Sequence, residues 1–104
     1  MKYSYSVTSF ANHLKEDMRL VVLRLLHELP QYRSNSSVLV AGLDRYGHSF
    51  SRDQVKTELH WLADQGLVVL EDDLGSVLVV KLTERGMDVA TGRISTHGVK
   101  RPSA

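Results

Sequence analysis

Apolar residues recur near the start of the chain at the three- and four-residue spacing of a helix face. The recurrence begins after Thr8 or Ser9, either of which is a suitable N-cap, and stops before Pro30, which ends a helix. Before it, residues 3–7 alternate tyrosine or valine with serine, a period of two that predicts a short N-terminal strand. The predicted apolar face of the first helix consists of Ala11, Leu14, Met18, Val22, Leu25 and Leu29.

A second helix is expected after a polar loop at residues 31–36. Ser36 or Ser37 is its predicted N-cap. The helix is expected to run to about Tyr46, because Gly47 can adopt the left-handed conformation that ends a helix.

The third helix begins only a few residues after Gly47. Ser51 and Gln54 have the spacing of a capping box, and Phe50 and Val55 have that of a hydrophobic staple. The pattern therefore predicts two helices joined by a tight turn. The buried stripe of the third helix is predicted to consist of Val55, Leu59 and Leu62, with Gly66 at its end.

The rest of the chain predicts a β-hairpin, a short last helix and a tail. Two apolar runs, residues 67–70 and 77–82, flank a turn-forming EDDLGS segment, and Thr83 is a suitable cap for the last helix. The segment 92–104 contains no acidic residue and few large apolar ones, which predicts a flexible basic tail after a domain at residues 1–91.

The local motifs resemble those of winged helix-turn-helix regulators. LHWLADQGLV at residues 59–68 is similar to the exit of the recognition helix in MarR, PadR and ArsR-like proteins, and KLTERGMDVA at residues 81–90 is similar to the segment that leaves the wing in the MarR and PadR groups. The short length and basic tail also resemble small winged-helix proteins of Mu-like prophages. The resemblance implies a mainly helical α+β winged helix-turn-helix, with a three-helix core, a β-hairpin wing and a short C-terminal helix.

Composition sets further bounds. The chain has 104 residues, which is the length of a single domain. Its net charge of +1 does not by itself indicate a nucleic-acid-binding protein. The absence of cysteine excludes disulfides and thiolate metal ligands. The N-terminal residues lack the apolar core of a signal peptide, and Arg24 interrupts the best apolar run, so we expect a soluble cytoplasmic protein with no membrane partner.

In the family reading, the third helix enters the major groove of double-stranded DNA. Its predicted contact residues are Arg52, Lys56, Thr57 and His60, among which Asp53 is also placed, and the tail bases Arg93, Lys100 and Arg101 are predicted to grip phosphates. The charge pattern opposes this reading, because residues 51–92 carry four basic and eight acidic side chains. Three of these acids, Glu71, Asp72 and Asp73, are at the predicted wing tip, where phosphates would be repelled.

Some apolar residues fall outside the predicted core faces. Leu20 and Leu23 lie opposite the main face of the first helix, and Trp61 lies at the edge of the third-helix stripe. Both predicted strands are apolar on two faces, so Tyr3 and Tyr5 or a partner chain should cover the outer one. We interpret Leu20 and Leu23 as the interface of a homodimer, with cover from within the chain as the alternative. Trp61 is expected to be half-buried against another helix or the N-terminal strand, with an exposed interface anchor as the alternative.

No motif for catalysis, a cofactor or a metal is present. The five histidines have no ligand spacing, and no phosphate-binding loop or nucleophile elbow occurs. We therefore expect no enzyme and no cofactor. Two functions remain open. One is a winged-helix transcriptional regulator that binds DNA, and the other is a phage-encoded winged-helix protein-interaction module that binds another protein without binding DNA.

Overall fold

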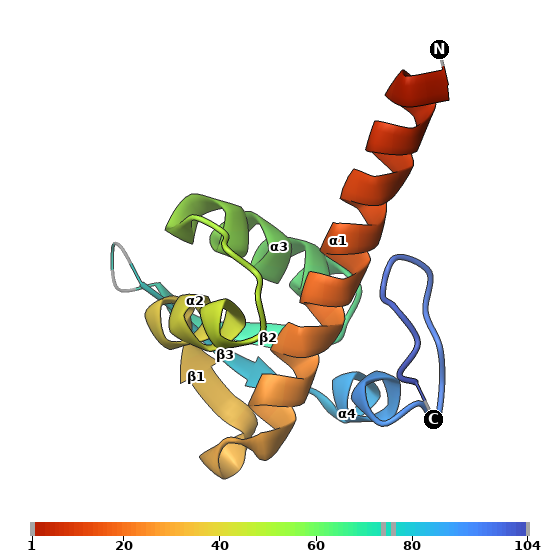
Figure 1. Cartoon of the computed structure of the whole chain (residues 1–104). Coiled ribbons are helices and arrows are strands. Elements are labelled where there is room, and N and C mark those ends of the chain that lie inside the picture. Colours follow the sequence, from red (N-terminus) through yellow and green to blue (C-terminus); the bar gives the residue numbers. More distant parts are fainter. Residues whose placement is uncertain (1, 74, 76, 104) are drawn as a thin grey trace.

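The computed structural model describes the backbone of residues 2–73, 75 and 77–103, and the side chains of residues 9–72, 75 and 77–103. The architecture is α+β, with four α-helices and a three-stranded antiparallel sheet (Figure 1). The elements in chain order are α1 (Lys2–Glu28), a 3-10 turn (Pro30–Tyr32), β1 (Arg33–Asn35), α2 (Ser36–Arg45), α3 (Arg52–Asp64), β2 (Val68–Asp73), β3 (Leu78–Leu82) and α4 (Glu84–Ala90).

The predicted N-terminal strand at residues 3–7 is wrong, because α1 begins at Lys2 and includes this segment. No proline or glycine interrupts the chain from Lys2 to Glu28, so nothing local stops the helix. The sheet edge that an N-terminal strand could have joined is taken by β1. The side chains of Tyr3 and Tyr5, the predicted internal cover of the sheet, lie outside the described residues.

The helix-turn-helix corner is confirmed at the level of single hydrogen bonds. Gly47 has a φ of +84°, and the Ser51 hydroxyl accepts a bond from the Gln54 backbone N–H at 3.1 Å while the Gln54 side chain accepts one from the Ser51 N–H at 2.8 Å. The cap of α2 is Asn35 rather than a serine, because its side-chain oxygen accepts a bond from the Val38 N–H. These local bonds set α2 and α3 against each other.

The predicted hairpin is present, and the sheet contains a third strand that the sequence pattern missed. The strand order is β1-β3-β2, and the three residues of β1 pair with β3 where a loop was predicted. A three-residue polar strand carries no periodic signal, so only its partner reveals it. A bulge between Leu70 and Asp72 then shifts the register toward the tip of the hairpin.

One hydrophobic core fills the space between the helices and the inner face of the sheet. Leu20 and Leu23 are 3% and 0% exposed, within a core that also contains Val89 and Ala90 of α4. The prediction that they form a dimer interface is therefore wrong, and the cover comes from within the chain. On the outer face of the sheet Val69 remains half exposed. No helix of the described part of the chain is long and apolar enough to cross a membrane.

The tail is not the flexible segment that was predicted. Val99 is buried, the Lys100 N–H donates to the Glu16 carbonyl at 3.1 Å, and Pro102 packs near Gly92. Figure 1 shows the tail folding back beside α1 and α4. A low content of apolar residues misled the prediction, because a single buried valine and a few backbone bonds are enough to hold this segment.

Candidate nucleic-acid interface

The outer face of α3 is polar and open to solvent, whereas its inner face is buried. Val55, Leu59 and Leu62 are fully buried in the core. Of the predicted contact residues, Arg52, Thr57 and His60 are exposed and Lys56 is half-buried. The helix therefore presents side chains with hydrogen-bonding groups on the surface of the helix-turn-helix. The Thr57 hydroxyl donates to the Asp53 carbonyl at 3.0 Å, which positions it along the helix.

A base from another element lies beside this face. Lys15 of α1 lines the same shallow pocket, of about 170 Å³, as Phe50, Gln54 and Thr57. Lys15 is not among the contact residues predicted from the sequence. Local patterns do not reveal it, because the two helices are brought together only by the tertiary fold.

The wing carries less unbalanced negative charge than its sequence suggests. Glu71 of β2 forms an ion pair with Arg33 of β1 across the outer face of the sheet. The pair is solvent-exposed, so its contribution to stability is small, at about 0–1 kcal/mol. The pair matters more for the surface charge, because the Glu71 carboxylate is neutralised by Arg33 of β1, a strand that was not predicted from the sequence.

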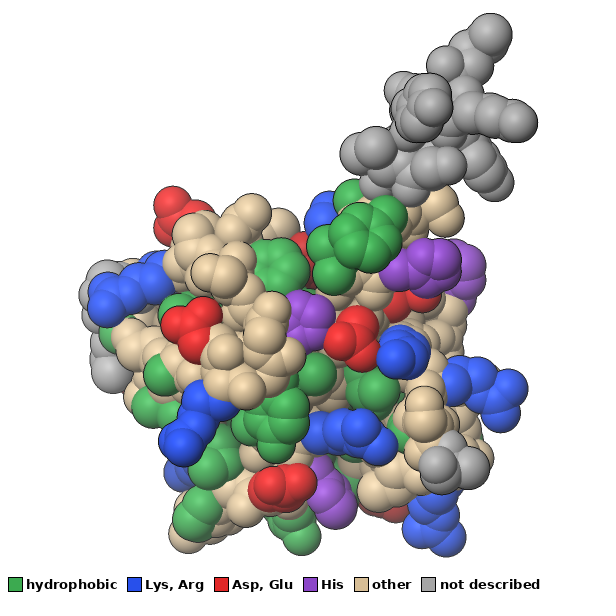
Figure 2. All heavy atoms as spheres, viewed as in Figure 1, with side chains coloured by type: hydrophobic (Ala, Val, Ile, Leu, Met, Phe, Trp, Pro, Cys, Tyr) green, Lys and Arg blue, Asp and Glu red, His purple; other side chains and the backbone are tan. Residues whose placement is uncertain are grey.

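No broad positive region is visible on the face shown in Figure 2. Blue and red side chains alternate there, and neither sign dominates a whole element. On α3 itself, Arg52 and Lys56 are balanced by Asp53 and Asp64, so the described charges of this outer face cancel. Strong sequence-independent attraction to phosphates is therefore not expected from α3 alone.

The predicted basic tail residues do not gather with the α3 residues. Arg93, Lys100 and Arg101 are exposed, but the tail lies on the other side of α1 from the N-terminal end of α3 (Figure 1). Lys100 Nζ also lies 3.4 Å from Asp17 Oδ1, so part of its charge is already matched within the chain. The structure thus divides the predicted contact residues into an α3 group and a tail group.

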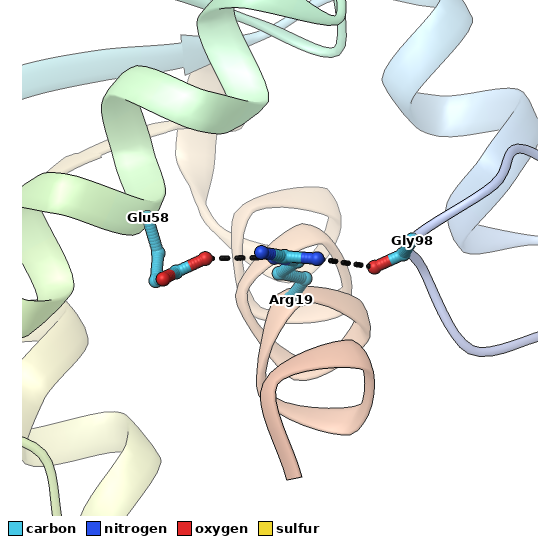
Figure 3. Close-up of polar contacts among 3 residues, drawn as sticks. All are labelled: Arg19, Glu58 and Gly98. Atoms are coloured by element: carbon cyan, nitrogen blue, oxygen red, sulfur yellow. Dashed lines mark hydrogen bonds and ion pairs between the residues drawn. The ribbon is translucent and has the colours of Figure 1, made fainter. Parts of the chain in front are cut away.

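Arg19 holds the tail against α1 and α3 (Figure 3). Its Nε donates to Glu58 Oε1 at 2.7 Å, and its Nη1 donates to the Gly98 carbonyl at 2.8 Å. The guanidinium carbon lies 3.8 Å from the ring centroid of Trp61. Both charged side chains are about nine-tenths buried, so each depends on the other to offset desolvation.

Trp61 is therefore half-buried by contacts within the chain, as predicted, and the alternative of an exposed interface anchor is not observed. It is half-buried between Arg19 and Gly98, and Gly98 has a φ of +91°. A Cβ at Gly98 would lie 2.7 Å from the indole ring, so only glycine allows the tail to approach so closely. The glycine was not singled out in the sequence, since no local motif marks it.

A second polar contact, between His48 and Asp17, holds the helix-turn-helix corner against α1. His48, which is buried in the turn between α2 and α3, has its Nε2 2.7 Å from Asp17 Oδ2. Burial by itself would raise the pKa of Asp17, but the hydrogen bond from His48 and the charge of Lys100 outweigh it, so the pKa lies below its usual value. Among the described residues, no group of three or more His, Asp or Glu side chains is arranged to hold a metal ion.

The chain resembles proteins of known sequence over most of its length. It is 51% identical over 89 residues to gp26 of Escherichia phage Mu, described as an uncharacterized protein, and the match covers 86% of this chain and 91% of that protein. The chain belongs to the same family as phage Mu gp26. An uncharacterized protein of Haemophilus influenzae is 40% identical over 94 residues, covering 90% of this chain and 91% of the other. No family model matches the chain.

A solved structure supports the winged-helix architecture. A PadR family transcriptional regulator from Eggerthella lenta superposes with a TM-score of 0.55 at 24% sequence identity, over 88% of this chain and 81% of that one. At this identity the likeness concerns the fold. The four helices and three-stranded antiparallel sheet are those of a winged helix, as the motifs at residues 59–68 and 81–90 predicted.

Proposed function

We propose that this protein is a winged-helix DNA-binding protein that acts as a transcriptional regulator. The observation that carries the proposal is the exposed polar outer face of α3, directly after a tight helix-turn-helix corner and within the same domain as the β2–β3 hairpin. A helix presented in this way can enter the major groove, where its N-terminal residues meet base edges. The PadR-like fold supports the proposal of a DNA-binding regulator, and the likeness to a phage Mu protein supports a role in a phage.

In this proposal Arg52 and Lys56 provide the cationic contacts. Both are near the start of α3, and an arginine or a lysine can bond guanine or phosphate oxygens. Thr57 and His60 add polar contacts, and Lys15 adds a cation from α1. Because Asp53 and Asp64 oppose phosphates, we expect modest affinity at physiological salt and a larger affinity at low salt.

The test is the affinity of the full chain for a fluorescent DNA duplex, measured by anisotropy over a range of salt concentrations. We expect the double variant Arg52→Ala with Lys56→Ala to bind about tenfold more weakly at low salt and to lose up to about two units of salt slope. The matched control, Arg93→Ala with Arg101→Ala, removes the same charge from the tail, the proposed auxiliary contact, and should lose less affinity. A native protein that fails to bind any duplex at low salt would contradict the proposal, as would a larger loss in the tail variant.

A second candidate function is a protein-interaction module. It is favoured by the exposed carboxylates of Asp53 and Asp64 on α3, which suit a basic protein partner better than DNA. A pull-down from the native host with and without nuclease separates the two functions. Partners lost after nuclease treatment favour the regulator, whereas one defined partner that persists favours the module.

A further inference from the structure

One side of α1 carries apolar residues that the fold leaves open. Phe10 is 65% exposed and Leu14 is 40% exposed, and farther along the helix Val21 and Leu25 are only partly buried. With Phe10 at zero and about 100° per residue, Val21 lies at about 20°, Leu14 at about 40° and Leu25 at about 60°. These four residues therefore form one stripe, which we call the α1 stripe. Figure 1 shows the N-terminal turns of α1 extending beyond the rest of the domain.

The spacing within the α1 stripe is symmetrical. Phe10 and Leu14 are four residues apart, as are Val21 and Leu25. A two-fold axis that runs beside α1, perpendicular to it and level with the midpoint between Asp17 and Met18, would place Phe10 opposite Leu25 of a second copy and Leu14 opposite Val21. A two-fold symmetric contact requires this kind of self-complementary surface, in which the same patch serves both copies. We propose that two copies of this chain pair antiparallel through their α1 stripes.

The structure contains a receiving site for Phe10 of the second copy. A pocket of about 270 Å³ is lined by Val21, Arg24, Leu25, Glu28 and Tyr46. It lies at the end of the stripe that an antiparallel partner's Phe10 would reach. Its lining combines apolar side chains with one cation and one anion, so its charges balance when a phenyl ring enters.

The available surface agrees with a small dimer. Complete burial of an aromatic side chain removes about 150–250 Å² from water. Phe10 and Tyr46 are 65% and 61% exposed, so two copies of this pair supply roughly 400–600 Å². Leu14, Val21 and the stems of Arg24 and Glu28 extend the contact toward the roughly 1,200 Å² of the smaller stable interfaces. We therefore expect a reversible dimer rather than an obligate one.

Asp17 lies at the centre of this contact but does not oppose it. Its carboxylate is held by His48 Nε2 at 2.7 Å and Lys100 Nζ at 3.4 Å, so it enters the interface with its charge matched. The Lys100 side chain is 52% exposed. The polar centre and apolar ends thus form a self-complementary pattern of charge as well as of shape.

The first test is the mass of the full chain in solution by sedimentation equilibrium across a wide range of protein concentration. We expect native protein to pass from monomer to dimer, and Phe10→Asp with Leu14→Asp to remain monomeric. The matched control is Val38→Asp, which changes a side chain that is 48% exposed in the first turn of α2, outside the stripe. All variants should keep the native circular dichroism spectrum, since each position is exposed. A monomeric native protein at every concentration overturns the proposal.

The second test fixes the direction of pairing and uses the absence of native cysteine. Phe10→Cys and Leu25→Cys proteins are oxidised separately and as a mixture. Antiparallel pairing predicts a covalent heterodimer in the mixture and little covalent dimer from either protein alone. A parallel pair would instead join Phe10→Cys to itself, and that result overturns the proposed geometry. Both tests are free of DNA, so their failure is distinguishable from failure of the proposed function.

Discussion

At the residue scale, Gly86 shows how one absent side chain sets the packing of α4 on the sheet. A Cβ at this position would lie 2.1 Å from the Leu67 carbonyl oxygen and 2.5 Å from Leu82 Cδ1. The carbonyl belongs to the backbone and cannot move aside without displacing the strand. We expect Gly86→Ala to lower the free energy of unfolding by about 3 kcal/mol, measured by urea denaturation.

Gly47 provides the comparison for this prediction. It has a φ of +84°, but a Cβ there would meet nothing within 4 Å, so Gly47→Ala incurs only the backbone strain of about 1–2 kcal/mol. Gly86→Ala should therefore be the more destabilising of the two. Equal or reversed losses would show that α4 does not pack against Leu67 as described.

The ionisation of Asp17 makes the stability of the folded chain depend on pH. Its lowered pKa means that the folded state favours the ionised carboxylate more than the unfolded chain does. The resulting stabilisation is present above the ordinary pKa of 3.8 and is lost as the pH falls through the lowered folded-state value. We expect Asp17→Asn to reduce the free energy of unfolding by about 0.5–1 kcal/mol at neutral pH, and the difference to vanish once the pH falls below the lowered pKa of the folded state.

The groups facing Asp17 are His48 from the helix-turn-helix corner and Lys100 from the tail. Chemical denaturation at a series of pH values measures the effect, and Glu16→Gln, which removes the neighbouring carboxylate, is the control. A loss that stays constant from neutral to acidic pH would mean that the carboxylate charge does not contribute.

At the element scale, the tail is fixed by a few contacts that can be broken one at a time. Val99 is 6% exposed, and Gly98 beside it contacts the ring of Trp61. We expect Val99→Asp to release the tail, to lower the free energy of unfolding by about 2 kcal/mol and to shift Trp61 emission to longer wavelength. Trp61 is the sole tryptophan of the chain, so its fluorescence reports this site directly.

Ile94→Asp is the matched control for the tail, because Ile94 is 38% exposed in the same segment. Its emission spectrum should stay close to that of the native protein. If Val99→Asp leaves the emission of Trp61 unchanged, the tail does not cover the indole in solution.

The elements that could be predicted from the sequence are those fixed by local bonds. The capping box at Ser51 and the left-handed Gly47 each act within a few residues, and both were predicted from spacing alone. The elements that were missed depend on distant partners. The strand β1 forms only because β3 offers an edge, and the tail is held by Arg19, 79 residues away from Gly98 along the chain.

The residues of the candidate site also divide into those that local patterns predict and those that only the tertiary fold brings together. The exposed polar residues of α3 were predicted because the helical period places them opposite the buried stripe. Neither Lys15 beside Thr57 nor the Arg33–Glu71 pair could be predicted, since each joins segments more than thirty residues apart. The interface prediction for Leu20 and Leu23 failed because the cover provided by α4 has no local signature.

At the scale of the whole molecule, the charge distribution separates this chain from a strongly basic DNA-binding protein. Positive and negative groups are interspersed, and the fold uses several of them for internal ties between α1, α3 and the tail. A protein of this kind gains less from general phosphate attraction, so its DNA contacts must come from a small number of side chains on α3. We therefore expect DNA binding to depend on the outer face of α3.

The most direct test is to record amide chemical shifts of the native protein by NMR while a DNA duplex is added at low salt. The proposed function predicts that the largest changes fall on the first half of α3, from Arg52 to His60, with smaller changes elsewhere. If no amide shifts, or if the changes gather on residues outside α3, the assignment of α3 as the DNA-reading helix is contradicted.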